Sequence, residues 1–85
     1  MKHTLTILLQ NEAGALVRVA GLFAARGHNI HTLDVAPTRD PAVSRLVVTV
    51  FGDRARLTRI LNQIRKLVDV LDVQHSTIDA VHTAA

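Results

Sequence analysis

The segment from Asn11 to His28 contains the residues best suited to bind a small ligand. It leads from an apolar run through a turn that contains Gly14 into a stretch with helical periodicity. The first N–H groups of a helix lack intrahelical partners and can bind a small carboxylate. We expect Asn11 to cap this helix and the missing Cβ of Gly14 to let a ligand approach the backbone. The same residues also fit an ordinary capped strand-to-helix turn.

Five histidines raise the question of a metal site: His3, His28, His31, His75 and His82. Only His28 and His31 are close in sequence. Their odd spacing at the start of an expected strand directs their side chains to opposite faces. Because no carboxylate stands at a ligand spacing from them, we expect surface histidines and no metal site.

No pattern typical of a catalytic centre is present. The chain has no cysteine, no Gly-x-Ser-x-Gly elbow and no phosphate loop, and Glu12 is its single glutamate. Small hydrolases of acyl phosphates need an arginine in the loop after the first strand, whereas residues 10–14 contain none. We therefore predict that the chain is not an enzyme and binds no cofactor.

The net charge of +3 raises the possibility of nucleic-acid binding. Half of the ten basic residues, however, fall on one amphipathic segment, where they form the solvated side of a helix: Arg54, Arg56, Arg59, Arg65 and Lys66. Aromatic residues make up only 2% of the chain, so there is little material for stacking on bases. The charge pattern favours a solvated helix over a nucleic-acid site.

The length of 85 residues predicts one small domain. The sequence has no run of 18 uninterrupted apolar residues and no basic-then-apolar leader at Met1, which argues against a membrane span or a signal peptide. The absence of cysteine fits a reducing compartment. We expect a cytoplasmic protein.

The hydrophobic pattern predicts six elements. Strands are expected over residues 4–9, 29–36, 44–51 and 68–74. Helical spacing is found in two sets: Leu16, Val19, Ala20 and Phe23, then Leu57, Ile60, Leu61 and Ile64. Gly27 ends the first helix, and Gly52 with Asp53 begins the second. Residues from Ser76 onward have the character of a frayed tail, and we assign residues 1–78 to the domain and 79–85 to a flexible C-terminal tail.

This βαββαβ order predicts an α+β fold, the ferredoxin-like sandwich, with two helices on one face of a four-stranded antiparallel sheet. The opposite face is not purely polar, because it carries Leu8, Val47 and Phe51. The second strand, expected at an edge, has apolar side chains and no lysine to discourage pairing. We therefore expect a homodimer or a larger assembly.

Six fragments occur in the order and at the spacing of one family. They are Leu-x-Asn-Glu-x-Gly-Ala-Leu at residues 9–16, Gly-Leu-Phe at 21–23, Arg-Gly-His-Asn-Ile at 26–30, Val-Ala-Pro-Thr-x-Asp-Pro at 35–41, Ser-Arg at 44–45 and Lys-Leu-Val-Asp-Val-Leu at 66–71. From residue 3 to about residue 75, the chain resembles the ACT domain of the regulatory (small) subunit of acetolactate synthase, also called acetohydroxyacid synthase.

The resemblance implies a module that senses a branched-chain amino acid, chiefly valine, and regulates a catalytic (large) subunit carrying thiamine diphosphate, magnesium and a flavin. In the family the effector lies between two ACT domains, held by the turn after the first strand of one and the start of the second strand of the other. The matching positions are Asn11, Ala13, Gly14, Ala15 and Leu16 on one side, and Asn29 and Ile30 on the other.

On this basis N–H groups near Gly14 and Ala15 would take the α-carboxylate, and Leu16 with Ile30 would line a small apolar pocket. The asparagine side chains would orient the polar end. The family's small subunit usually continues into a second domain, so we expect either a single-domain form or a piece. A free-standing amino-acid sensor with another target and a ferredoxin-like nucleic-acid binder are the alternatives. Whether valine, leucine or isoleucine is the effector stays open.

Overall fold

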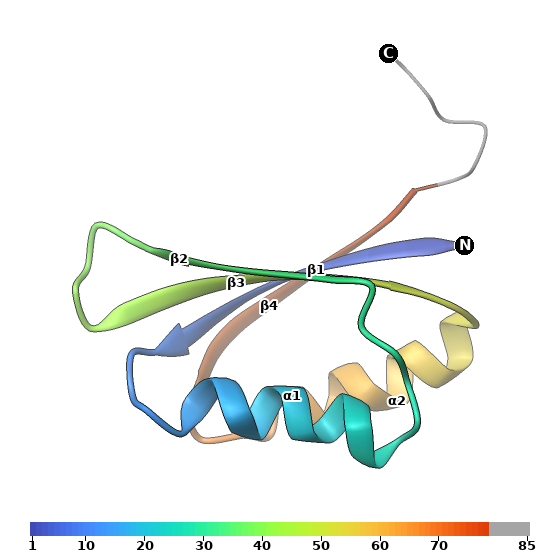
Figure 1. Cartoon of the computed structure of the whole chain (residues 1–85), viewed down its shortest axis with the longest axis horizontal. Helices are drawn as coiled ribbons and strands as arrows, with labels where there is room; N and C mark the ends of the chain where they lie inside the picture. The colour runs from blue at the N-terminus through green and yellow to red at the C-terminus, as the bar shows by residue number, and fades with distance from the viewer. Residues whose placement is uncertain (79–85) are drawn as a thin grey trace.

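The elements follow the expected order. The computed structural model describes residues 1–78, which form β1 (Lys2–Gln10), α1 (Ala15–Ala25), β2 (Thr32–Pro37), β3 (Val43–Phe51), α2 (Arg54–Ile64) and β4 (Val70–Ile78). The strands pair antiparallel in the order β2-β3-β1-β4. Both helices lie on the same side of this sheet (Figure 1). The predicted ferredoxin-like fold is therefore confirmed.

One core fills the space between the sheet and the helices. Every second residue of β1 points into it, so that Leu5, Ile7 and Leu9 are buried. The four predicted core positions of α2 are all buried, since its apolar residues repeat with the helical period. In α1 the buried side chains are Ala15, Val19 and Phe23, whereas Leu16 is only partly buried.

Within residues 1–78, no helix covers the other sheet face. Leu8 and Val47 are half-buried there, and Phe51 is exposed. The second strand does lie at an edge, and Leu33 and Val35 are exposed on it. The uncovered face and the apolar edge are thus confirmed, and the assembly they predict remains a prediction.

The bounds of β2 and β4 differ most from the expectation. Residues 29–31 form a loop, because ladder pairing of β2 with β3 begins only at Thr32. The last strand starts at Val70, after a turn in which the Val70 N–H donates to the Leu67 carbonyl, and residues 76–78 continue it instead of fraying. The predicted flexible tail, residues 79–85, lies outside the described residues. No helix within residues 1–78 is long and apolar enough to cross a membrane.

Candidate functional site

The turn between β1 and α1 borders a cavity of about 200 Å³, which we call the turn cavity. Its lining comprises Leu9, Gln10, Asn11, Glu12, Ala13, Ala15, Leu16, Val35 and Ser44. Four of the five site residues predicted for this turn are in that lining, and Gly14 is not. The cavity combines aliphatic side chains with polar groups beside the first turn of α1. This combination suits a small molecule with one apolar and one charged end.

Asn11 does not cap α1. The N-cap is Gly14, and no side chain makes a capping hydrogen bond. The Asn11 Nδ2 atom instead donates to the Pro41 carbonyl at 3.1 Å, and the Ser44 Oγ atom lies 3.1 Å from Asn11 Oδ1. The Asn11 side chain therefore ties the turn to the β2–β3 loop. Its amide keeps one further donor and one further acceptor position for a ligand.

The space beside Gly14, which we expected to be open to a ligand, is filled by the Arg18 side chain. A Cβ at this position would lie 2.6 Å from Arg18 Nη1, so the guanidinium already occupies that space. Arg18 is held there by an ion pair with Asp69, whose side chain is only 6% exposed. Hydrogen bonding to Asp69 raises the pKa of Arg18 above its ordinary value. The sequence did not predict this ion pair, because Arg18 and Asp69 are 51 positions apart and no single motif contains both.

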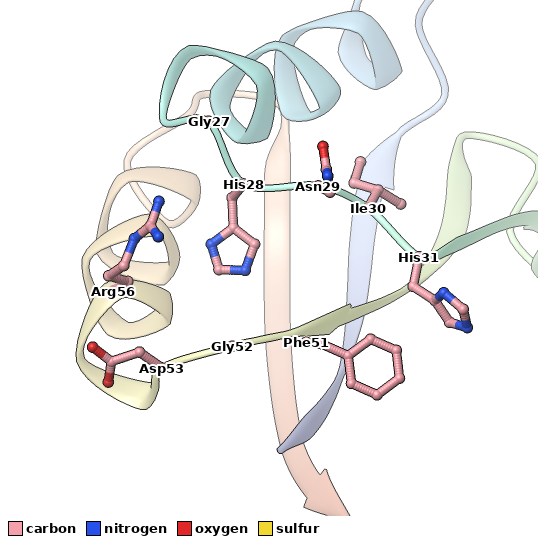
Figure 2. Close-up of a pocket in the computed structure, with 9 residues that line it drawn as sticks. All are labelled: Gly27, His28, Asn29, Ile30, His31, Phe51, Gly52, Asp53 and Arg56. Carbon is pink, nitrogen blue, oxygen red and sulfur yellow. The ribbon is translucent and has the colours of Figure 1, made fainter.

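The remaining two predicted residues, Asn29 and Ile30, lie in the loop at the other end of α1. They line a larger cavity of about 530 Å³, which we call the loop cavity (Figure 2). Its lining comprises Gly27, His28, Asn29, Ile30, His31, Phe51, Gly52, Asp53 and Arg56. Because α1 has 11 residues, roughly 16 Å of helix separates the two cavities. One chain therefore does not bring the two groups of predicted residues together.

The end of α1 fixes the position of His28. The His28 N–H donates to the Phe23 carbonyl at 2.9 Å, and the Gly27 N–H donates to the Ala24 carbonyl at 3.0 Å. This is a Schellman motif, and it needs a left-handed residue, which Gly27 provides with φ of 64°. The motif places the His28 ring edge-on against Phe23, with 6.1 Å between ring centroids.

The β3–α2 turn forms the other wall of the loop cavity. Asp53 caps α2 as expected, since its Oδ1 atom accepts the Ala55 N–H at 3.0 Å. One turn further along, Arg56 Nη2 donates to the Arg26 carbonyl at 3.1 Å, at the end of α1. This hydrogen bond orients the Arg56 side chain along the cavity.

Two histidines that were predicted to lie on the surface are buried instead. His28 is 7% exposed and His3 is fully buried. His28 and His31 also line the same cavity, because they lie in a loop and not in an alternating strand. Within residues 1–78, no group of three or more histidine, aspartate or glutamate side chains is arranged to hold a metal ion.

The chain matches the family model described as AHAS small subunit-like ACT domain over residues 5–72. It is 53% identical over 73 residues to the acetolactate synthase isozyme 3 small subunit of Escherichia coli, and 51% identical over 73 residues to the acetolactate synthase small subunit of Haemophilus influenzae. Each match covers 86% of this chain and 45% of the relative. The chain thus spans about half the length of the curated relatives it matches.

Comparison with solved structures points to the same family. The acetolactate synthase small subunit of Thermotoga maritima superposes with a TM-score of 0.81 at 38% identity, over 96% of this chain and 50% of that one. The ACT domain of the Chlorobium tepidum GTP pyrophosphokinase gives 0.70 at 17% identity, over 89% of this chain and 97% of that one, which shows the shared fold alone. Since the family model covers most of the sequence and the relatives share about half of its residues, the chain belongs to the AHAS small subunit-like ACT domain family.

Proposed function

We propose that this ACT domain of the acetolactate synthase small-subunit type binds a branched-chain amino acid, chiefly valine, between two copies of the chain. Through that binding it would regulate the catalytic large subunit of acetolactate synthase. The domain itself would be non-catalytic, and the large subunit would carry the cofactors. We place this assembly in the cytoplasm.

One observation carries the proposal: the residues predicted to hold the effector fall at opposite ends of α1, in two separate cavities. Asn11, Ala13, Ala15 and Leu16 line the turn cavity, while Asn29 and Ile30 line the loop cavity. A site that needs both groups therefore requires two chains, with the turn of one copy facing the loop of the other. The exposed edge strand β2 offers a surface for such pairing.

The turn cavity has the chemistry that a branched-chain amino acid requires. Leu9, Leu16 and Val35 give it an aliphatic wall suited to a small branched side chain. The Ala15 N–H already donates to the Glu12 carbonyl at 3.1 Å, so the N–H groups that follow it in the first turn of α1 would bind the α-carboxylate. The Asn11 amide and the Glu12 carboxylate, both in the lining, can accept hydrogen bonds from the α-ammonium group.

Regulation follows from linkage. An effector bound across two copies stabilises the arrangement of the pair that closes the site. If the catalytic subunit is more active with the other arrangement, effector binding opposes activity. A tenfold shift in that equilibrium needs only about 1.4 kcal/mol of difference in effector affinity between the two states, which charge-assisted hydrogen bonds can supply.

The test has a binding arm and an activity arm. Calorimetry of the chain against valine, leucine and isoleucine should give saturable heat with at least one of them. Acetolactate formation by a large subunit should rise when the chain is added and fall again with the bound amino acid. Absence of heat with all three would contradict the effector assignment, and three unchanged rates would contradict the partner assignment.

A pair of variants locates the effector. Asn29→Ala should weaken inhibition and leave activation nearly unchanged, because Asn29 lies in the loop cavity and its side chain is exposed. Asn62→Ala removes the same amide from an exposed position on α2 outside both cavities and should change neither property. Equal inhibition in both variants would exclude Asn29 from the effector site.

A further inference from the structure

His28 is buried without satisfying its hydrogen-bonding groups. Its side chain belongs to the lining of the loop cavity, yet Nδ1 and Nε2 are both buried and have no hydrogen-bond partner within residues 1–78. Buried polar groups in folded proteins are nearly always paired, since an unpaired group loses its hydration without compensation. A position that needed only an apolar filler against Phe23 would be better served by another phenylalanine. The imidazole therefore indicates a polar partner that enters the cavity.

The groups around His28 are mainly hydrogen-bond donors and positive charge. Arg56 lines the cavity, and among the residues that the structure describes its guanidinium has one hydrogen-bond partner, the Arg26 carbonyl, which accepts from Nη2. Figure 2 shows the His28 ring above Gly52, with Arg56 on one side and His31 and Phe51 on the other. The negative group in the lining, Asp53, has an oxygen engaged by the Ala55 N–H at the start of α2.

The His28 ring packs against Gly52 in the β3–α2 turn. A Cβ built at Gly52 would lie 3.5 Å from His28 Nε2, so the ring packs directly over this residue. Gly52 has φ of 145°, which side-chain-bearing residues rarely adopt. Together they bring the imidazole next to the amino end of α2, where helix N–H groups add positive potential.

We propose that the loop cavity is a binding site for a small anion, a carboxylate or a phosphate group. Because both ring nitrogens are buried, the His28 ring must turn toward the cavity to donate a hydrogen bond to an anion oxygen, and Arg56 provides the balancing charge. An amine ligand fits less well, because Arg56 repels it and Asp53 is occupied as a cap. All of these groups come from one chain. The proposal therefore goes beyond effector binding and does not depend on a second copy.

The direct test follows the His28 ring nitrogens by ¹⁵N NMR while the chain is titrated with sodium acetate, and separately with sodium phosphate, at constant pH and ionic strength. We expect a saturable shift of the His28 signals with at least one anion. Saturation with acetate alone identifies a carboxylate site, and saturation with phosphate alone identifies a phosphate site. No saturable shift with either anion overturns the proposal.

Matched variants separate the site from general attraction by surface arginines. Arg56→Gln should lower the affinity for the anion at least tenfold. Arg59→Gln is the same change three residues further along α2, outside the loop cavity, and it should leave the affinity unchanged. Arg56→Lys should retain part of the affinity because it keeps the charge. Equal affinities in Arg56→Gln and Arg59→Gln would overturn the proposal.

A second variant does not rely on the arginine. His28→Phe should fold, since the ring packs against Phe23 and the buried polar atoms are lost, and its thermal midpoint should equal or exceed that of the parent. The anion-dependent shifts of the Asn29 and Gly52 amides should disappear in this variant. If those shifts persist unchanged, His28 does not hold the anion.

Discussion

The Nδ1 atom of His3 lies 3.0 Å from the Nε2 atom of His75, which joins β1 to β4 at the edge of the core. His3 Nε2 lies 3.1 Å from the Gly52 carbonyl oxygen, which can only accept. We therefore assign the proton of neutral His3 to Nε2, which leaves Nδ1 to accept from His75 or from the Thr77 hydroxyl, 3.2 Å away. Full protonation of both rings would place two positive charges at this contact.

Stability should consequently depend on pH through His75. Burial, then the positive charges of His3, Arg54 and Arg65, lower the pKa of His75 from its ordinary 6.5. Because the folded state then binds fewer protons than the unfolded state, the free energy of unfolding should be largest above pH 6.5 and fall as the pH decreases through that value. Urea denaturation at several values between about pH 8 and about pH 5.5 measures this slope.

Two variants test whether His75 causes this dependence of stability on pH. His75→Gln removes the titrating ring and should make the decline with acid shallower, whereas His31→Gln, at an exposed ring outside the pair, should leave it intact. If His75→Gln retains the full slope, another group is responsible for the loss of stability in acid.

Two glycines should respond to alanine with opposite signs. Gly52 has φ of 145°, so Gly52→Ala should lower the free energy of unfolding by about 1–3 kcal/mol. Gly21 lies on the exposed side of α1, where an added Cβ meets nothing within 4 Å, so Gly21→Ala should raise it by about 0.5–1 kcal/mol. Denaturant titration of the two variants beside the parent gives both values. If Gly21→Ala instead lowers the free energy of unfolding, another surface packs against α1 at this position.

The edge strand should control assembly. Val35 is 54% exposed on β2, and a lysine there should block pairing between edges. We expect light scattering to give a dimer or larger mass for the parent and the 9.3 kDa monomer for Val35→Lys. Val68→Lys, at an equally apolar and more exposed residue in the turn before β4, should keep the parent's mass. A monomeric parent would contradict the shared effector site.

Periodic features of the sequence predicted the fold well. The alternation in β1 and the helical spacing in α2 identify the buried residues directly, because each pattern has only one face to bury. Boundaries set by nonlocal bonds were less accessible. The extension of β4 to Ile78 depends on pairing with β1 and on the contact of His3 with His75, which are 72 positions apart.

The sequence predicted residues that line the two cavities, but it did not predict how their side chains are arranged. The motif comparison placed Asn11 and Gly14 in one turn, but it could not show that the Asn11 side chain bonds to the β2–β3 loop or that Arg18 covers Gly14. Both arrangements depend on groups from distant elements. The burial of His28 was missed although its signal was present, since Gly27 directly before it favours a Schellman motif that turns the next residue toward the core.

Gly14→Asp should abolish effector binding while the fold survives. The new side chain must displace the Arg18 guanidinium, whose Nη1 atom lies 2.6 Å from the Cβ position, and its carboxylate would compete with Asp69 for that arginine. It would also repel an effector carboxylate at the first turn of α1. Because the buried Asp69 would lose or share its arginine, the free energy of unfolding should fall by about 1–3 kcal/mol, which leaves the fold intact.

Calorimetry with valine and urea denaturation measure these two effects of Gly14→Asp separately. Gly14→Ala is the matched control for the charge of the side chain, because it also displaces Arg18 but adds no carboxylate. It should therefore lower the affinity for valine less than Gly14→Asp does. If Gly14→Asp binds valine as tightly as the parent, the β1–α1 turn serves only to start the helix, and the effector must be held elsewhere.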